Sequence, residues 1–178
     1  MKTIPYMGSK RKLLPFLKDS MDDYLDGAEL YSFFDAFAGS GRVSHHFRNR
    51  YRIIANDRQS YTKVILEAYL QNTKNTQYFQ YVIDGLNALP DQYWSRTDGW
   101  YAKTYGAAEN NGSSIGADGN PKPWVDYNAR KIDCIRHKID DLYPQECVEK
   151  SVLLVSLMLG VSKISCLLYT SPSPRDRQ

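Results

Sequence analysis

The sequence predicts an α/β protein, and three neighbouring features of its N-terminal half support that prediction. Aromatic and apolar residues at 30–34 are typical of a strand that is buried on both faces. This run leads into Phe-Asp-Ala-Phe-Ala-Gly-Ser-Gly at 34–41, an acidic, glycine-rich turn, and a helix begins at Arg42. A second strand at 51–56 ends at Asp57. In this order, the features indicate the first part of a Rossmann unit.

The glycine-rich turn is a place where a ligand can touch the backbone. Gly39 and Gly41 have no Cβ, so the chain can turn sharply and a ligand can approach closely. The following helix N-terminus offers unpaired N–H groups to a polar or anionic moiety. Asp57 lies sixteen residues beyond Gly41, close to the separation at which a carboxylate meets ribose hydroxyls in a Rossmann unit. The pattern indicates a nucleoside cofactor, and an ordinary strand-to-helix turn is the simpler alternative.

Two features of the turn bear on which nucleoside it would hold. The dinucleotide fingerprint has a third glycine three residues after the second, and Ser44 occupies that position here. The acidic Asp35 before the turn suits a ligand with positive charge better than one with two phosphates. S-adenosylmethionine has a sulfonium, an ammonium and a ribose, so it fits these electrostatics.

An N-terminal segment makes the prediction more specific. Tyr-Met-Gly-Ser-Lys stands at 6–10. It precedes a helix whose expected apolar face consists of Leu13, Leu14, Leu17 and Met21. Together with the turn at 35–41 and the Asn-Asp pair at 56–57, this segment resembles the Dam-like (D12) class of N6-adenine DNA methyltransferases, whose members carry three such motifs in this order. The resemblance covers 1–70 closely and extends more loosely through 128–133 and the apolar helix at 151–165.

The resemblance implies a Rossmann-like, S-adenosylmethionine-dependent methyltransferase fold, incomplete here, with the first two strands and a helical, loop-rich segment. It implies methyl transfer to adenine N6 in double-stranded DNA, with the target base flipped into a pocket beside the cofactor. The residues that it places at the cofactor are Tyr6, Lys10, Asp35, Phe37, Ala38, Gly39, Ser40, Gly41 and Asp57. The first two would contact the cofactor from the N-terminal segment, the turn would hold its methionine part, and Asp57 would hold the ribose.

Three of these residues also have plainer interpretations. Tyr6 is then a hydrophobic residue before the helix, and Lys10 belongs to a solvated basic run that covers apolar surface. Phe37 is then an aromatic residue of the core or of the cradle wall, with no part in the chemistry.

The family's catalytic loop is the part of the pattern that this sequence does not match. Members use Asp/Asn-Pro-Pro-Tyr/Phe, whose polar residue and proline carbonyl accept hydrogen bonds from the adenine amino group while the aromatic ring stacks on the base. Only Asn-Pro-Lys-Pro-Trp at 120–124 comes near, and it lacks adjacent prolines. We therefore assign no catalytic residue and expect this chain alone to be inactive.

The composition changes abruptly after Ser165. The residues at 166–178 resemble the translation of a sequencing-library adapter, and a genuine Ser/Pro-rich tail is the alternative. We therefore expect a fragment with three parts: a cofactor-binding part at 1–70, a helical target-recognition segment at 71–165 and a non-native tail at 166–178.

Composition excludes several classes of protein. An aromatic share of 13% and a hydrophobic share of 42% exclude a disordered chain. The N-terminus has no signal-peptide core, and no apolar run reaches the length of a membrane span. Cys134, Cys147 and Cys166 form neither a metal nor a disulfide pattern. We expect a cytoplasmic protein, prokaryotic or phage-encoded, without a metal site.

The charge gives a weaker indication of a partner. A formal charge of +3 is not by itself a nucleic-acid signature. Basic clusters at 10–12, 48–52 and 130–138 are suited to phosphate, although each is more commonly a solvated face. The aromatic-rich middle of the chain contains a polar loop at 106–123 that is long enough to reach DNA, with an ordinary surface insertion as the alternative.

These observations give a set of expectations for the whole chain. Strands are expected at 30–34 and 51–56, and helices at 10–24, 42–50, 60–71, 77–89, 128–142 and 145–165. We expect a monomer acting on double-stranded DNA, with any cognate restriction endonuclease acting separately. Two other functions stay open. One is an NAD-type oxidoreductase, which Asp57 permits but which predicts neither Ser44 nor the segment at 6–10; the other is a catalytically silent DNA-binding module.

Overall fold

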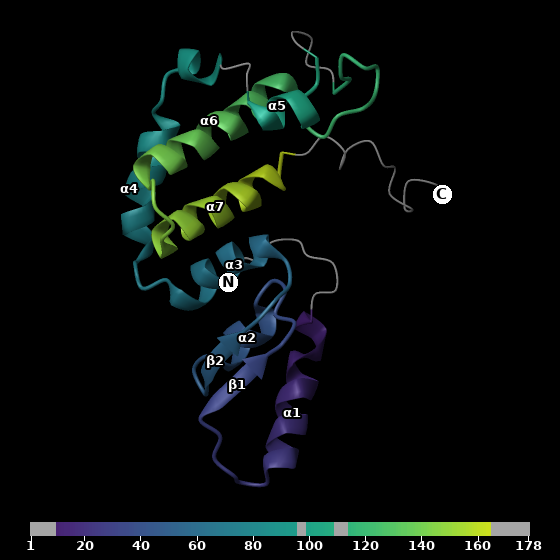
Figure 1. The fold of residues 1–178 in the computed structure, drawn as a ribbon, viewed down its shortest axis with the longest axis vertical. Coiled ribbons are helices and arrows are strands. Elements are labelled where there is room, and N and C mark those ends of the chain that lie inside the picture. The colour runs from purple at the N-terminus through teal and green to yellow at the C-terminus, as the bar shows by residue number, and fades with distance from the viewer. Residues whose placement is uncertain (1–9, 96–98, 109–113, 165–178) are drawn as a thin grey trace, which may run out of the picture. The chain divides into compact units, whose positions relative to one another are not determined.

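The computed structural model describes residues 10–95, 99–108 and 114–164 as a mixed α/β structure with a two-stranded parallel sheet (Figure 1). The elements in chain order are a 3₁₀ turn (Arg11–Leu13), α1 (Leu14–Leu25), β1 (Ser32–Asp35), α2 (Arg42–Phe47), β2 (Arg52–Ala55), α3 (Ser60–Leu66), a π-helical turn (Glu67–Gln71), α4 (Thr76–Asn87), a 3₁₀ turn (Asp91–Ser95), α5 (Trp100–Tyr105), α6 (Asp126–Leu142) and α7 (Val148–Val161). The chain divides into two compact units. The first contains the residues up to Thr73 together with Glu146–Val155, and the second contains Lys74–Gln145 and the residues from Ser156 onward.

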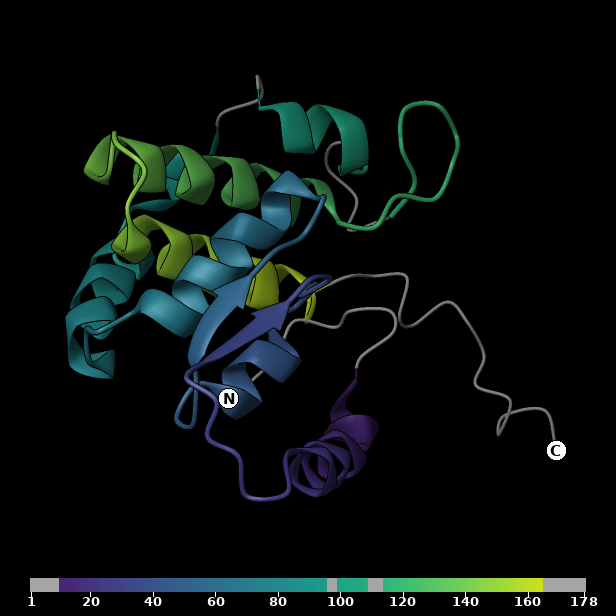
Figure 2. The ribbon, with the colours of Figure 1, turned by 60° about the horizontal axis from the view of Figure 1, so that its bottom comes forward.

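The sheet of the first unit pairs β1 with β2 in parallel, with Phe33 opposite Ile53 and Phe34 opposite Ile54. Helix α2 connects the two strands and packs on one face of the pair (Figure 2). The ring of Phe33 lies 5.1 Å from that of Phe47 on α2, measured between centroids. This packing holds the carboxyl ends of both strands beside the start of α2.

The expectation that the first strand is buried on both faces is wrong for the described residues. Phe34 is 61% exposed and its partner Ile54 is 50% exposed, whereas Phe33 and Ile53 are half-buried. Side chains of a strand alternate between its two faces. Because α2 packs on the face that carries Phe33, the residues on the other face stay open to solvent.

The predicted helices agree with the structure at most positions. Helix α2 begins at Arg42 and α3 begins at Ser60, as expected, and α6 begins two residues before its expected start and ends at Leu142, as expected. Helix α7 is shorter than expected, by three residues at its start and four at its end. Helix α1 begins later than expected, at Leu14, because a 3₁₀ turn precedes it and Pro15 occupies its first turn, where a missing N–H costs nothing. None of the described helices is both long and apolar enough to cross a membrane.

Helix α5 of the second unit was not predicted, and a residue far along the chain fixes its start. The carboxylate of Asp133, buried on α6, accepts hydrogen bonds from the N–H groups of Tyr101 at 3.0 Å and Ala102 at 2.7 Å. These N–H groups belong to the first turn of a helix and have no partner within it. A Cβ atom on Gly99 would lie 2.1 Å from Asp133 Oδ2, so the approach requires glycine.

An aromatic cluster joins α5 to the chain that leads into α6. Neighbouring rings in the set Trp100, Tyr101, Tyr105 and Trp124 have centroids 4.9 to 6.3 Å apart. The indole N–H of Trp124 donates to the carbonyl of Val161, 3.4 Å away. The cluster therefore packs α5 against the chain just before α6 within the second unit, while Trp100 keeps 66% of its surface exposed.

Burial raises the pKa of the Tyr101 phenol to about 12. An unfolded tyrosine titrates at about 10, so the folded state holds this proton more tightly than the unfolded state does. The stability that follows is complete below about pH 10 and is lost as the pH rises through about 12. We expect Tyr101→Phe to flatten the alkaline fall in stability between these values, measured as denaturant midpoints at several pH values. An unchanged alkaline slope would show that Tyr101 does not cause it.

Candidate functional site

The predicted turn adopts the backbone conformation that its glycines suggested. Gly39 has φ 50° and Gly41 has φ 68°, both in the left-handed region that favours glycine. Gly41 is also the N-cap of α2, and a Cβ atom there would lie 2.9 Å from Leu66 Cδ2. The N–H of Ala38 donates to the carbonyl of Asn56 at 2.9 Å, which ties the turn to the end of β2.

Asp57, which follows β2, connects the glycine turn to this strand through hydrogen bonds of its carboxylate. Its Oδ2 accepts the N–H of Gly39 at 2.8 Å, and its Oδ1 accepts the N–H of Gln59 at 3.0 Å. Hydrogen bonds from the backbone N–H groups of Gln59 and Gly39 hold the pKa of the Asp57 carboxyl below its usual value. The carboxylate is therefore ionised at neutral pH, and it bonds to the turn predicted to hold a ligand.

Asp35 bonds to the helix on the other side of the turn. Its Oδ2 accepts both the N–H of Ser44 at 3.2 Å and the hydroxyl of Ser44 at 2.5 Å. Ser44 is fully buried in the first unit. Sequence reasoning singled out Ser44 only as a missing glycine, and it did not identify the serine as a partner of Asp35. An acidic residue before the turn, together with a hydroxyl residue in the first turn of the helix, was the available signal.

A cavity of about 540 Å³ opens beside the turn. Seven residues predicted to bind a cofactor line it: Lys10, Asp35, Phe37, Ala38, Gly39, Ser40 and Asp57. The structure places Gly41 at the helix start against Leu66, and Tyr6 lies outside the described residues. Phe37 is 90% exposed, which contradicts its interpretation as a core aromatic. The cavity combines two carboxylates with the cations of Lys10 and Arg42 and the exposed ring of Phe37.

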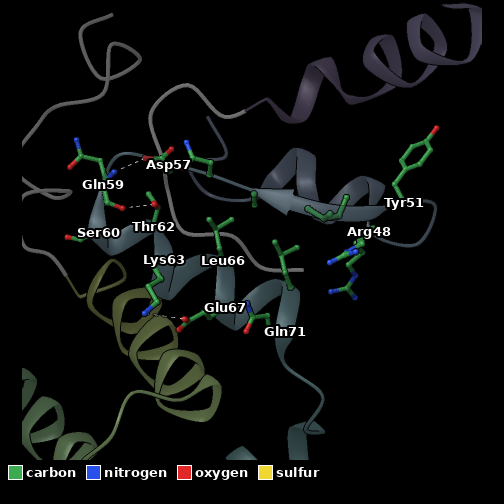
Figure 3. A pocket seen from close by; sticks show the side chains of 15 residues that line it. Arg48, Tyr51, Asp57, Gln59, Ser60, Thr62, Lys63, Leu66, Glu67 and Gln71 are labelled. Atoms are coloured by element: carbon green, nitrogen blue, oxygen red, sulfur yellow. Dashed lines mark hydrogen bonds and ion pairs between the residues drawn. The ribbon is translucent and has the colours of Figure 1, made fainter. Parts of the chain in front are cut away.

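A second cavity, of about 600 Å³, lies between β2 and the helical segment that follows it (Figure 3). Asp57 lines both cavities. Along the second, Thr62 donates its hydroxyl to the carbonyl of Gln59 at 2.6 Å, and Lys63 approaches Glu67 at 3.7 Å. The buried Ser151 of α7 donates its hydroxyl to Glu67 at 2.8 Å and so helps to hold the cavity wall.

Three arginines of the basic clusters expected to meet phosphate have partners within the protein. The guanidinium of Arg50 pairs with Asp22, and that of Arg130 pairs with Asp126 at 2.8 Å. Arg48 donates to the carbonyl of Tyr69 at 2.7 Å. Their first role is therefore structural.

The segment at 120–124, which comes near to the family's catalytic loop in sequence, makes structural contacts within the second unit. Lys122 pairs with Asp118 at 2.9 Å, and a hydrogen bond from its ammonium lowers the pKa of Asp118 to about 2. Trp124 belongs to the aromatic cluster, and its carbonyl accepts the N–H of Ala107 at 2.9 Å. Residues 109–113, which belong to the polar loop expected at 106–123, lie outside the described residues. Among those that are described, no group of His, Cys, Asp and Glu side chains is arranged to hold a metal ion.

Comparison with known proteins gives one family and several relatives. The model of the D12 class N6 adenine-specific DNA methyltransferase matches residues 6–165. Modification methylase LlaI of Lactococcus lactis subsp. lactis is 28% identical over 90% of this chain and 25% of its own length. Modification methylase StsI of Streptococcus sanguinis is 29% identical over 90% of this chain and 24% of its own length. Type II methyltransferase M.NlaIII of Neisseria lactamica is 26% identical over 90% of this chain and 46% of its own length.

The chain thus spans between about a quarter and about half of the length of these curated relatives. No solved structure matches it.

Proposed function

The chain belongs to the D12 class of N6 adenine-specific DNA methyltransferases, and from this premise we propose that it is part of an enzyme that methylates adenine N6 at a specific sequence in DNA. The methyl donor is S-adenosylmethionine. The observation that carries the proposal is the cavity beside the glycine turn, which is lined by seven of the nine residues expected to contact the cofactor.

The cavity fits this cofactor by charge. Asp35 and Asp57 both line it, and two carboxylates favour a sulfonium and an ammonium over a pyrophosphate. Lys10 and Arg42 line the same cavity, and a cation there pairs with the carboxylate of the methionine part. When bound, the cofactor supplies a methyl group on a positively charged sulfur, which an amino nitrogen can attack.

In this proposal, the residues of the chain bind the cofactor and orient it. Gly39 lets the ligand approach the backbone closely, and Asp57 holds the turn in place through the N–H of Gly39. A further lone pair on the Asp57 carboxylate accepts a ribose hydroxyl. The nucleoside part then extends from Asp57 toward the second cavity, which Asp57 also lines.

We assign the two steps of the function to different parts of the chain. The cofactor-binding part at 1–70 falls within the first unit, and the target-recognition segment at 71–165 falls mainly within the second. Exposed aromatic rings such as Trp100 and Tyr127 suit contact with nucleic acid. The substrate is double-stranded DNA, bound by a monomer, and a restriction endonuclease would act as a separate protein.

The fold proposed for the whole enzyme is the Rossmann-like methyltransferase fold. Parallel sheets are normally covered on both faces. Phe34 and Ile54 lie on an open face, so we propose that further elements of the whole enzyme cover them. The greater length of the relatives supports this proposal.

Titration with cofactor tests the proposal. We expect S-adenosylmethionine to quench the intrinsic tyrosine and tryptophan fluorescence of the chain and NAD to have no effect. A response to NAD without one to S-adenosylmethionine would contradict the proposal and favour an oxidoreductase. Salt-sensitive binding to DNA that no cofactor changes would favour a silent DNA-binding module.

A further inference from the structure

Ser44 is buried under the glycine turn, where its two donors meet a single oxygen of Asp35. The hydroxyl lies 2.5 Å and the N–H 3.2 Å from Oδ2. Ser44 has no exposed surface, so its hydroxyl has no access to water. Burying a hydroxyl without a hydrogen bond is costly, and the carboxylate of Asp35 meets this requirement.

The two carboxylate oxygens of Asp35 differ in their hydrogen bonds. Oδ2 accepts both donors from Ser44, whereas Oδ1 accepts no hydrogen bond from the described residues. A free aspartate rotates easily about its last side-chain bond. Two donors on one oxygen remove that freedom and leave the other oxygen available to a ligand. Asp35 lines the cavity beside the turn.

The position of Ser44 in the sequence supports a specific role. It stands where a dinucleotide-binding turn has its third glycine, which allows the helix to approach the strand closely. The helix and strand of this chain approach closely around a serine, and the hydroxyl spans the gap between α2 and the end of β1.

We propose that Ser44 is a positioning residue for the cofactor, which orients Asp35 so that its second oxygen meets the positive charge of the methionine part. This inference rests on the proposed function, because the ligand is the one proposed there. It adds a residue and a role that the family resemblance did not supply.

Two ligands separate positioning from a general loss of structure. S-adenosylmethionine carries the charged amino-acid part and the sulfonium, whereas 5′-methylthioadenosine shares the nucleoside and has neither. We expect Ser44→Ala to weaken the binding of S-adenosylmethionine about tenfold, as the loss of a hydrogen bond to a charged group does, and to change the binding of 5′-methylthioadenosine less than about twofold. Ser32→Ala, at an exposed serine on β1, is the matched control and should change neither.

A double-mutant cycle supplies the second readout. Asp35→Asn keeps the shape of the side chain and removes its charge, so we expect it to weaken the binding of S-adenosylmethionine selectively. Adding Ser44→Ala to this variant should then weaken the binding less than about twofold further, because Ser44 acts on the ligand only by orienting the Asp35 carboxylate.

Several outcomes would overturn the inference. Equal losses for both ligands, or additive effects in the cycle, would mean that Ser44 acts only on the structure. If Ser44→Ala does not fold in a thermal melt, Ser44→Cys replaces it with a side chain of similar size that donates only weakly, under the same expectation. A wild-type chain that binds neither ligand would contradict the proposed function itself and the inference with it. Wild-type binding with a uniform loss in the variant would contradict the inference alone.

Discussion

Replacing Asp57 by alanine is expected to weaken the binding of S-adenosylmethionine by at least about tenfold. The carboxylate accepts the N–H groups of Gly39 and Gln59, and the first of these lies in the turn that lines the cavity. Its removal leaves that N–H without its acceptor and takes away the proposed ribose partner in one step. Isothermal titration of the wild-type and variant chains measures the effect directly.

Two further variants make this test specific. Asp57→Asn keeps one carbonyl oxygen as an acceptor but turns an amide NH₂ toward the other donor, so its loss of affinity should be similar in size. Asp23→Ala removes an exposed carboxylate from α1, away from the cavity, and should leave the affinity unchanged. Unaltered binding in the Asp57→Ala chain would remove this residue from the site.

Loss of the Asp133 side chain is expected to destabilise the second unit by about 2–4 kcal/mol. Alanine at this position leaves the N–H groups of Tyr101 and Ala102 without the carboxylate that accepts them. Gly99→Ala should have an effect of similar size, because its Cβ would lie 2.1 Å from Asp133 Oδ2. Chemical denaturation followed by tryptophan fluorescence reports the change, since Trp100 and Trp124 pack in the cluster that α5 supports.

The control for this prediction lies on the same helix. Asp141 is exposed near the end of α6, so Asp141→Ala should change the free energy of unfolding by less than about 0.5 kcal/mol. If Asp133→Ala were as stable as this control, the hydrogen bonds to α5 would contribute nothing to the stability of the unit.

The local parts of the fold were predictable because their signals are local. A glycine turn between a strand and a helix places Gly39 and Gly41 at positive φ, and the start of α2 follows from it. Six of the seven predicted residues that line the cavity come from this turn or from Asp57 after the next strand. A turn, its glycines and the next strand are close in sequence, so one pattern contains them all.

The unpredicted parts depend on contacts between distant residues. Helix α5 has a short aromatic sequence without an apolar period, and its first turn is held by Asp133, 32 residues from Tyr101. The burial of the first strand depends on what covers each face, which its composition alone does not specify. The bond between Asp35 and Ser44 depends on how closely α2 approaches β1, a quantity that residue types do not fix.

The division of the first unit into two segments has a consequence for protein synthesis. The residues Lys74–Gln145 separate the segment that carries the glycine turn from Glu146–Val155, which completes the same unit. The hydrogen bond between Ser151 and Glu67 therefore joins positions 84 residues apart. At typical rates of translation the ribosome needs roughly 4 to 15 s to make the intervening chain. During these seconds the nascent strands and turn already exist while the helix that bonds to Glu67 does not. The wall of the second cavity at Glu67 therefore gains this hydrogen bond only after Lys74–Gln145 has been synthesised.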